Sequence, residues 1–268
     1  MLSILKRLDE VGFEKTRRAL AALSLSFFIS IYLILSLNAP PGWGPAFLAL
    51  SACYLVAFLS LTAEWFWGRW FASGIGWSGM MVAILALVMN GWITPLGIYG
   101  GLHALVVVAL SGKKMAAQYD LQERWRERYG MDEFGVARLR KTVTRASASL
   151  PSLILWALGP KEGQGGMLLA AAGIATLLSV AAGLRGLVQL RSWGWMLVTG
   201  AAASLWLLGS SDGATALATL FPTNWYQDLG FISTGANAPS VALLLPAVLL
   251  TLAALPFARP ALRFLRGR

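Results

Sequence analysis

Charge and cysteine are scarce in this sequence, and each shortage excludes a class of protein. Only 13% of the 268 residues are charged while 57% are hydrophobic, whereas soluble domains have about 25% charged and about 45–50% apolar residues. So few charged side chains cannot cover the surface of a water-soluble protein of this length. The one cysteine, Cys53, excludes an intrachain disulfide, a thiolate metal cluster and a redox cysteine pair. The composition therefore predicts an integral membrane protein.

Long hydrophobic runs without charge indicate the fold class. A helix needs about 20 largely apolar residues to cross a hydrocarbon core of about 30 Å. The candidate runs are 19–37, 45–63, 71–92, 96–112, 146–160, 166–184, 193–209 and 241–258. The run 146–160 is short, so we expect its helix to begin within the basic segment before it, with Arg145 reaching toward the interface. We predict an all-α integral membrane protein with about eight transmembrane helices.

The distribution of basic residues predicts the orientation of these helices, because short loops rich in Lys and Arg stay in the cytoplasm. Eight spans with cytoplasmic N- and C-termini leave Lys161 as the one basic residue outside. The net charge of +10 then follows mostly from topology, so nucleic acid is not an expected partner. The predicted location is the cytoplasmic (inner) membrane of a bacterium, as a multi-pass protein.

This topology divides the chain into three regions. Residues 1–112 are expected to hold an amphipathic N-terminal helix and transmembrane helices one to four. Residues 113–145 form a basic, helical cytoplasmic loop. Residues 146–268 hold transmembrane helices five to eight, a longer outside loop at 210–240 and a basic C-terminal tail.

Two segments of the chain resemble each other. LDEVGFEKTRRAL at 8–20 aligns without gaps to MDEFGVARLRKTV at 131–143. The identical pairs are Asp9/Asp132, Glu10/Glu133, Gly12/Gly135 and Arg17/Arg140. The pattern favours duplication of a four-helix unit, whose copies would be parallel because each crosses the membrane an even number of times. The alternative is that two basic helices before a span look alike by chance.

Polar residues within the spans are the first candidates for function. His103, the one histidine, lies near the middle of the fourth run, where an ionisable residue is a functional candidate. The alternative is a neutral histidine that makes one interhelical hydrogen bond. Glu64 is expected to form a local ion pair with Arg69 at the cytoplasmic interface, and Asn90 lies at the outer edge.

Cys53 and His103 raise a third possibility, that of a membrane enzyme. Helical rise places both residues at similar depth, and a thiolate–imidazole pair is a known catalytic device. The alternative is that both are structural, in which case Cys53→Ser leaves function intact.

Several small residues are expected to let helices approach closely. Gly74, Gly76 and Gly79 match a dinucleotide-binding pattern, but they lie in a membrane helix with no preceding strand, so the match is accidental. Two small-residue stripes favour close helix packing. They consist of Ala171, Ala175, Ser179 and Gly183 in one helix, and of Gly97 and Gly101 in another.

The basic loop carries a candidate docking helix. Apolar and aromatic residues recur at every fourth position among arginines, Gly130 is expected to end the helix, and Asp132 is expected to cap the next one. The helix either lies on anionic headgroups or docks to a cytoplasmic partner. The docking residues would be Leu121, Arg124, Trp125, Arg126, Arg128 and Tyr129.

These observations favour a non-enzymatic scaffold or accessory subunit of a membrane complex, because charged groups within the spans are so few. They assign no catalytic residue, no metal and no cofactor. The expected partners are the lipid bilayer, anionic lipid headgroups and a membrane or cytoplasmic protein. The alternative is a transporter or channel for a small, weakly polar or apolar solute, and the third hypothesis is an enzyme that uses Cys53 and His103.

Overall fold

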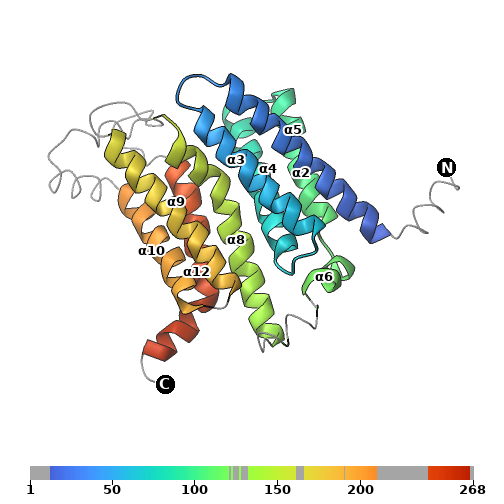
Figure 1. Cartoon of the computed structure of the whole chain (residues 1–268), viewed down its shortest axis with the longest axis vertical. Helices are drawn as coiled ribbons and strands as arrows, with labels where there is room; N and C mark the ends of the chain where they lie inside the picture. Colours follow the sequence, from blue (N-terminus) through green and yellow to red (C-terminus); the bar gives the residue numbers. More distant parts are fainter. Residues whose placement is uncertain are drawn as a thin grey trace, which may run out of the picture.

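In the part of the chain that the computed structural model describes, all regular secondary structure is helical (Figure 1). It describes residues 13–120, 122, 127, 132–160, 166–189, 191–209 and 241–265, and these ranges contain no strand. In chain order the helices are α2 (Phe13–Asn38), α3 (Gly44–Thr62), α4 (Gly68–Asn90), α5 (Thr94–Ala109), α6 (Lys113–Asp120), α8 (Glu133–Leu158), α9 (Gly166–Val188), α10 (Ser192–Gly209) and α12 (Val241–Leu265). The predicted all-α class is confirmed for this part of the chain.

Several of these helices are long and apolar enough to cross a membrane. Within the described residues there are 4, namely Phe13–Asn38, Gly44–Thr62, Gly68–Val88 and Ala170–Val188. A further span results if α5 and α6, which meet at 73°, are counted as one broken helix. The apolar parts of α10 and α12 are shorter, at Ser192–Leu208 and Leu243–Ala258. These lengths are those of a helical membrane protein, while the number of eight spans stays a prediction.

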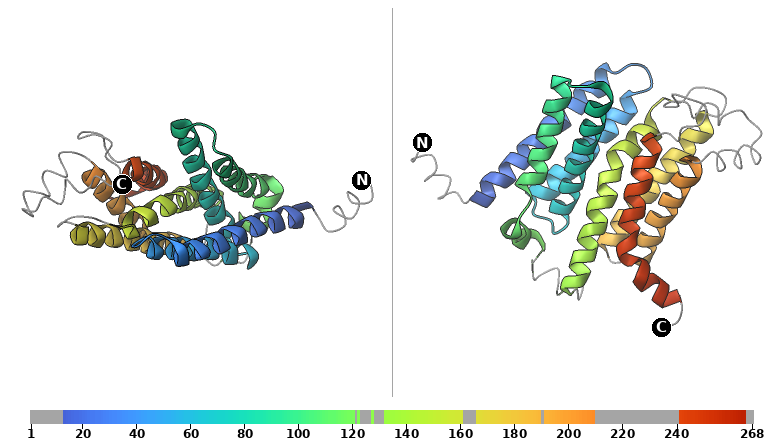
Figure 2. Two further views of the ribbon diagram at one scale, coloured as in Figure 1. Left: turned by 90° about the horizontal axis from the view of Figure 1, so that it is seen from above. Right: turned by 180° about the vertical axis from the view of Figure 1, so that it is seen from behind.

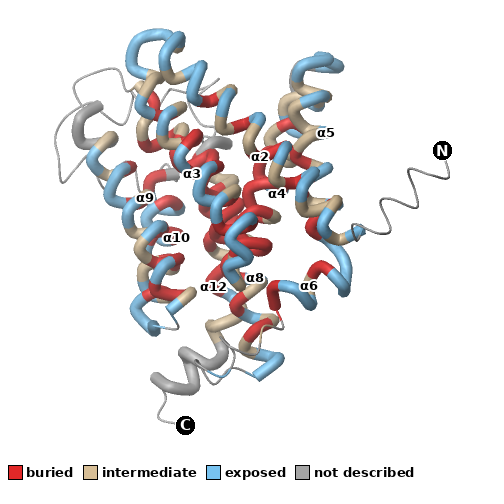
Figure 3. The backbone as a smooth tube through the Cα atoms, turned by 45° about the vertical axis from the view of Figure 1, so that its right-hand side comes forward, coloured by how far each residue is buried: buried red, intermediate tan, exposed pale blue. Residues whose placement is uncertain are grey.

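The long helices form two groups of four. In the first group α2 packs on α3, α3 on α4 and α4 on α5, and α5 returns to α2. The second group repeats this cyclic order with α8, α9, α10 and α12. The groups meet where α8 packs on α4 and α3 (Figure 2). Buried segments concentrate along this junction (Figure 3).

Helix α8 joins the basic loop to the second group without a break. It has 26 residues, which correspond to a length of about 39 Å. The Asp132 side chain caps its first turn by accepting a hydrogen bond from the Gly135 N–H at 2.7 Å, as predicted. Farther along, Arg145 donates to the carbonyl oxygen of Leu252 at 2.6 Å. The short run 146–160 thus begins in the basic segment, as expected from the sequence.

Glycines on α4 let this helix approach both of its neighbours. A Cβ atom at Gly74 would overlap the Thr144 carbonyl and the Ser147 hydroxyl of α8. A Cβ atom at Gly76 would lie 2.9 Å from Val107 of α5, and one at Gly79 would overlap the His103 ring. The three glycines therefore serve close helix packing, as predicted, at the seam between the groups and within the first group.

The two small-residue stripes differ in what they contact. Gly183 of α9 faces α10, where an added Cβ would lie 2.8 Å from Val198. At Gly101 nothing lies within 4 Å, and an added Cβ at Gly97 would meet the ring of Trp92. Within the described residues, packing at Gly183 is confirmed, whereas Gly97 and Gly101 do not bring another helix close.

The corner between α3 and α4 has the same hydrogen-bond pattern as the corner between α9 and α10. In the first corner the Trp65 N–H donates to the Ser60 carbonyl (3.0 Å) and the Gly68 N–H donates to the Trp65 carbonyl (2.8 Å). In the second corner the Arg191 N–H donates to the Gly186 carbonyl (2.8 Å) and the Gly194 N–H donates to the Arg191 carbonyl (3.0 Å). The residues of the second corner follow their counterparts by 126 positions, as Gly186 follows Ser60. Each corner contains a glycine in close contact with the end of the preceding helix.

The close approach of α4 to α8 leads to a stability prediction. Replacing an exposed glycine within a helix by alanine normally stabilises the protein, by about 1 kcal/mol. We expect this for Gly101→Ala, which adds a methyl group in open space. Gly74→Ala should instead destabilise the protein by about 1–3 kcal/mol, because it forces a methyl group against the α8 backbone. Unfolding of the two variants in detergent, followed by circular dichroism, compares them, and equal midpoints would contradict the close packing.

Candidate functional site

Most of the charged contacts gather at one end of the bundle. There α2, α4 and α8 begin, α3 and α5 end, and the short helix α6 lies across them. Arg17 of α2 donates to the carbonyl of Val108 at 2.8 Å and to that of Ser111, both at the end of α5. Because carbonyls at a helix C-terminus carry partial negative charge, a guanidinium is well placed there.

At the centre of this end lies a group of four residues that we call the Asp120 cluster: Arg69, Trp70, Asp120 and Arg140. Arg69 binds the carboxylate of Asp120 in two places, through Nε to Oδ1 at 3.2 Å and through Nη2 to Oδ2 at 2.6 Å. The indole N–H of Trp70 donates to Oδ1 at 2.7 Å. Arg140 Nη1 donates to Oδ2 at 3.3 Å. Such two-point, charge-assisted bonds are among the strongest that side chains form.

The Arg69–Asp120 pair of the cluster is buried, and the cluster connects four helices. Arg69 is 8% exposed and Asp120 is 4% exposed. Arg69 also donates through Nη1 to the carbonyl of Leu110, at the end of α5, at 3.1 Å. A buried charge is costly unless it is paired and hydrogen-bonded. The one carboxylate on α6 therefore balances the charge at the start of α4 and holds α8 beside it.

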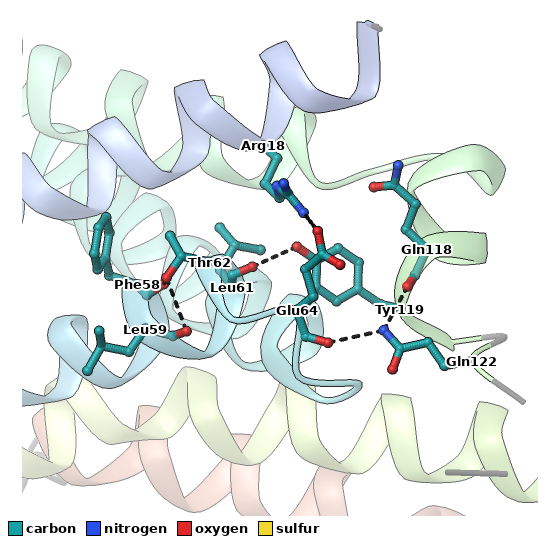
Figure 4. Close-up of polar contacts among 9 residues, drawn as sticks. All are labelled: Arg18, Phe58, Leu59, Leu61, Thr62, Glu64, Gln118, Tyr119 and Gln122. Atoms are coloured by element: carbon teal, nitrogen blue, oxygen red, sulfur yellow. Dashed lines mark hydrogen bonds and ion pairs between the residues drawn. The ribbon is translucent and has the colours of Figure 1, made fainter. Parts of the chain in front are cut away.

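A second contact fixes α6 to the turn between α3 and α4 (Figure 4). The Arg18 guanidinium pairs with the Glu64 carboxylate. Tyr119 donates through its hydroxyl to the Leu61 carbonyl at 2.9 Å, and Gln122 donates to the Glu64 carbonyl at 3.1 Å. Burial raises the pKa of the Tyr119 phenol above its ordinary value. Helix α6 is thus held at its C-terminal end both by this turn and by the Asp120 cluster.

The predicted ion pair between Glu64 and Arg69 is wrong. Glu64 pairs with Arg18 of α2, whereas Arg69 pairs with Asp120 of α6. Helix α3 ends at Thr62, and Glu64 has a left-handed φ of 54°. The turn therefore sends the two side chains to different partners, although they are five positions apart in the sequence.

His103 occupies a separate, uncharged cluster inside the first group. Its Nδ1 lies 2.8 Å from the Tyr99 carbonyl and its Nε2 lies 2.7 Å from the Tyr54 hydroxyl. Since a carbonyl only accepts, Nδ1 carries a proton, and if the ring is neutral its Nε2 accepts from the Tyr54 hydroxyl. His103 is 1% exposed, and its ring centroid lies 4.0 Å from that of Phe28. This geometry is that of the structural alternative, a neutral histidine with an interhelical hydrogen bond.

The same geometry bears on the proposed cysteine–histidine pair. Cys53 is 8% exposed and lies on α3 beside Tyr54. Both ring nitrogens of His103 are engaged by Tyr54 and Tyr99, so neither is directed to a thiol. In the part of the chain that the structure describes, no group of three or more His, Cys, Asp or Glu could hold a metal ion.

The remaining predicted site residues are not placed by the structure. Asn90 is the last residue of α4, but the structure does not describe the position of its side chain. The docking candidates Leu121, Arg124, Trp125, Arg126, Arg128 and Tyr129 lie outside the described residues, as does the loop 210–240. Analysis of the sequence missed the Asp120 cluster. Its one signal was Asp120 itself, the first acidic residue after Lys113 and Lys114 in a basic loop.

Beside the Asp120 cluster lies a cavity of about 280 Å³ between α4, α5 and α8. Its wall includes four cationic side chains, those of Arg69, Arg140, Lys141 and Arg145, and no carboxylate. A second hollow of about 500 Å³ lies between α9 and α10 and is lined by small and apolar residues, among them Ala172, Gly200 and Ser204.

The two ion pairs at this end should differ in their contribution to stability. We expect Asp120→Asn to destabilise the protein by about 3–5 kcal/mol, because it leaves Arg69 buried without a counter-ion. Glu64→Gln is the matched control. It breaks a pair whose side chains are 25% and 55% exposed, which should cost about 0–1 kcal/mol. Thermal unfolding in detergent measures both, and a similar loss from the two variants would refute the central role of Asp120.

The chain matches no known family model, no curated protein sequence and no solved structure.

Proposed function

We propose that this protein is a non-enzymatic scaffold or accessory subunit of a membrane complex, with a docking segment in its cytoplasmic loop. The observation that carries the proposal is the state of His103. This side chain is buried, and both of its ring nitrogens are engaged within the bundle. An intramembrane histidine that moved protons or bound a charged solute would need access to that solute.

The proposed topology has eight spans, with both termini and the 113–145 loop in the cytoplasm of a bacterium. Its support is the gathering of basic residues at one end. Arg17, Arg18, Arg69 and Arg140 all make their contacts there, as the positive-inside rule requires. The length of α8, whose 26 residues include the short run 146–160, is sufficient for a fifth span.

Duplication of a four-helix unit is part of the proposal. The two groups share a cyclic order of packing, and their second corners share a hydrogen-bond pattern. The separation of 126 between the corners differs by three from the offset of 123 between segments 8–20 and 131–143. A short insertion within one copy accounts for this difference, and the copies would be related by an axis along the membrane normal.

The anchoring of α6 supports a docking role for the loop that follows it. Tyr119, Asp120 and Gln122 bind the bundle through two separate sets of contacts. The loop therefore leaves the bundle from a fixed point. A segment held in this way loses less conformational freedom when a partner binds it, which favours affinity. Trp125 and the neighbouring arginines would then supply the contact residues, since aromatic and Arg anchors carry much of the energy of interfaces.

The topology can be tested with single cysteines in a Cys53→Ser background. Lys114→Cys suits the cytoplasmic loop, because the Lys114 side chain is 86% exposed. Lys161→Cys and Arg268→Cys report on the predicted outside loop and on the C-terminus. We expect an impermeant maleimide to label position 161 in intact cells, and positions 114 and 268 only after the membrane is opened. Labelling of position 268 from outside would overturn the eight-span topology.

The scaffold role predicts a partner that depends on Trp125. We expect a protein to copurify with the wild type from mild detergent and to be lost from Trp125→Ala, because an aromatic anchor is removed. Trp92→Ala is the matched control. Trp92 is 78% exposed and lies between α4 and α5, at the other end of these helices from the Asp120 cluster. Copurification followed by mass spectrometry of the recovered proteins measures the difference.

Three outcomes of this experiment would decide against the proposal. Recovery of a lone, monodisperse protein from the wild type favours the alternative, a transporter or channel for a small weakly polar or apolar solute. Equal recovery of the partner from Trp125→Ala removes the docking role. Loss of the copurifying partner only when Arg124, Arg126 and Arg128 are replaced by Gln, and not in Trp125→Ala, indicates a helix that lies on anionic lipid. There each basic residue contributes about 1 kcal/mol to binding of the membrane surface.

A further inference from the structure

The cavity beside the Asp120 cluster has an excess of positive charge. Arg69, Arg140, Lys141 and Arg145 line it, and none of its lining residues is acidic. Asp120 lies next to it and binds Arg69 closely, with a longer contact of 3.3 Å to Arg140. One carboxylate cannot balance four cations, so the cavity carries a net charge of +3. Such an excess in a concave site attracts an anion.

Hydrogen-bond donors on the cavity wall suit an oxyanion. Lys141 is exposed and forms no ion pair within the described part of the chain. Ser73 and Thr144 line the same wall, and among the described residues neither hydroxyl has a hydrogen-bond partner. Arg145 also lines the cavity, while its Nη1 binds the Leu252 carbonyl of α12. Arginine, lysine and hydroxyl groups are the side chains that bind phosphate oxygens.

The wall of the cavity changes from basic to apolar along α4. Trp77 follows Arg69 by eight residues, which places it about 12 Å farther along the helix. Trp77 is 44% exposed and lines the cavity together with Val107. Val108, the next residue of α5, is 66% exposed. A ligand in this site would have its anion among the cations and an apolar part beside Trp77.

We propose that this cavity binds the phosphate headgroup of an anionic phospholipid from the cytoplasmic leaflet. Basic pockets between transmembrane helices on this side of a membrane suit such headgroups. The volume of about 280 Å³ is at the lower limit of small-molecule sites, so it holds a headgroup while the acyl chains lie outside, along Trp77 and Val108. The apolar wall favours a lipid over free phosphate, which would leave that wall unused.

The cavity lies at the junction between the two groups of helices, so a bound lipid would contact both. The lining residues Ser73 and Thr144 belong to α4 and α8, the two helices whose packing joins the groups. A headgroup bound there contacts both groups at once. The lipid would therefore stabilise their association in proportion to its occupancy of the site.

Native mass spectrometry of the full chain, purified in an uncharged detergent, tests the proposal. The probes are dioctanoyl phosphatidylglycerol, dioctanoyl phosphatidylcholine and inorganic phosphate. We expect the wild type to bind the anionic lipid about tenfold more tightly than the zwitterionic one. Lys141→Gln should weaken binding of the anionic lipid about fivefold, the factor that corresponds to about 1 kcal/mol for one basic residue.

Arg138→Gln is the matched control, because Arg138 is an exposed basic residue of α8 that does not line the cavity. It should bind the anionic lipid as the wild type does. Thr144→Val is a second test variant, for use if Lys141→Gln fails to fold. It keeps the shape of the side chain while removing a hydrogen-bond donor, so it too should weaken binding of the anionic lipid.

Three results would overturn the proposal. Equal affinity for the two lipids would show that the headgroup charge is not recognised. Equal weakening by Arg138→Gln and Lys141→Gln would show diffuse attraction to a basic surface instead of a site. Displacement of the anionic lipid by inorganic phosphate at equal concentration would show that the cavity binds the free ion.

Discussion

The pairing of Arg69 with Asp120 is the interaction on which this end of the molecule depends. Arg69 begins α4, and its charge is buried among apolar helices, so it needs a counter-ion at close range. Asp120 supplies that counter-ion from α6, and the same carboxylate receives Trp70 and Arg140. The positions of α6, of the start of α8 and of the basic cavity all follow from this one pair.

The protein has two polar centres, the charged Asp120 cluster and the cluster around His103, and they differ in their surroundings. At the end of the bundle that carries the Asp120 cluster, charged side chains are paired. Arg69 and Asp120 are buried and offset each other's loss of hydration, whereas the more exposed Arg18–Glu64 pair forms at modest cost. Farther along the helices the polar cluster is neutral, because an ion there would lose its hydration without adequate replacement. Tyr54, Tyr99 and His103 therefore exchange hydrogen bonds with one another and with the backbone, and Phe28 covers the imidazole.

The sequence was sufficient to predict features that depend on local pattern. Apolar run lengths predicted the helices, Asp132 predicted the start of α8, and Gly74 predicted close packing. Pairing between distant side chains could not be obtained this way. Glu64 and Arg69 are near neighbours in the chain, yet the left-handed turn at Glu64 gives them partners 46 and 51 residues away. The hydrogen bond from Tyr54 to His103 likewise depends on how α2 and α4 bring α3 and α5 to face each other across the first group, which no periodicity specifies.

The separation between Arg69 and its counter-ion has a consequence for biosynthesis. Asp120 follows Arg69 by 51 residues, and ribosomes add about 5–20 residues per second. Asp120 is therefore synthesised about 3–10 seconds after Arg69, and the two side chains cannot pair before then. During that interval its guanidinium must stay hydrated or bound to lipid phosphate, so the start of α4 stays at the membrane surface. Final seating of the first four helices is thus delayed until the loop has been synthesised, which makes their assembly depend on the order of translation.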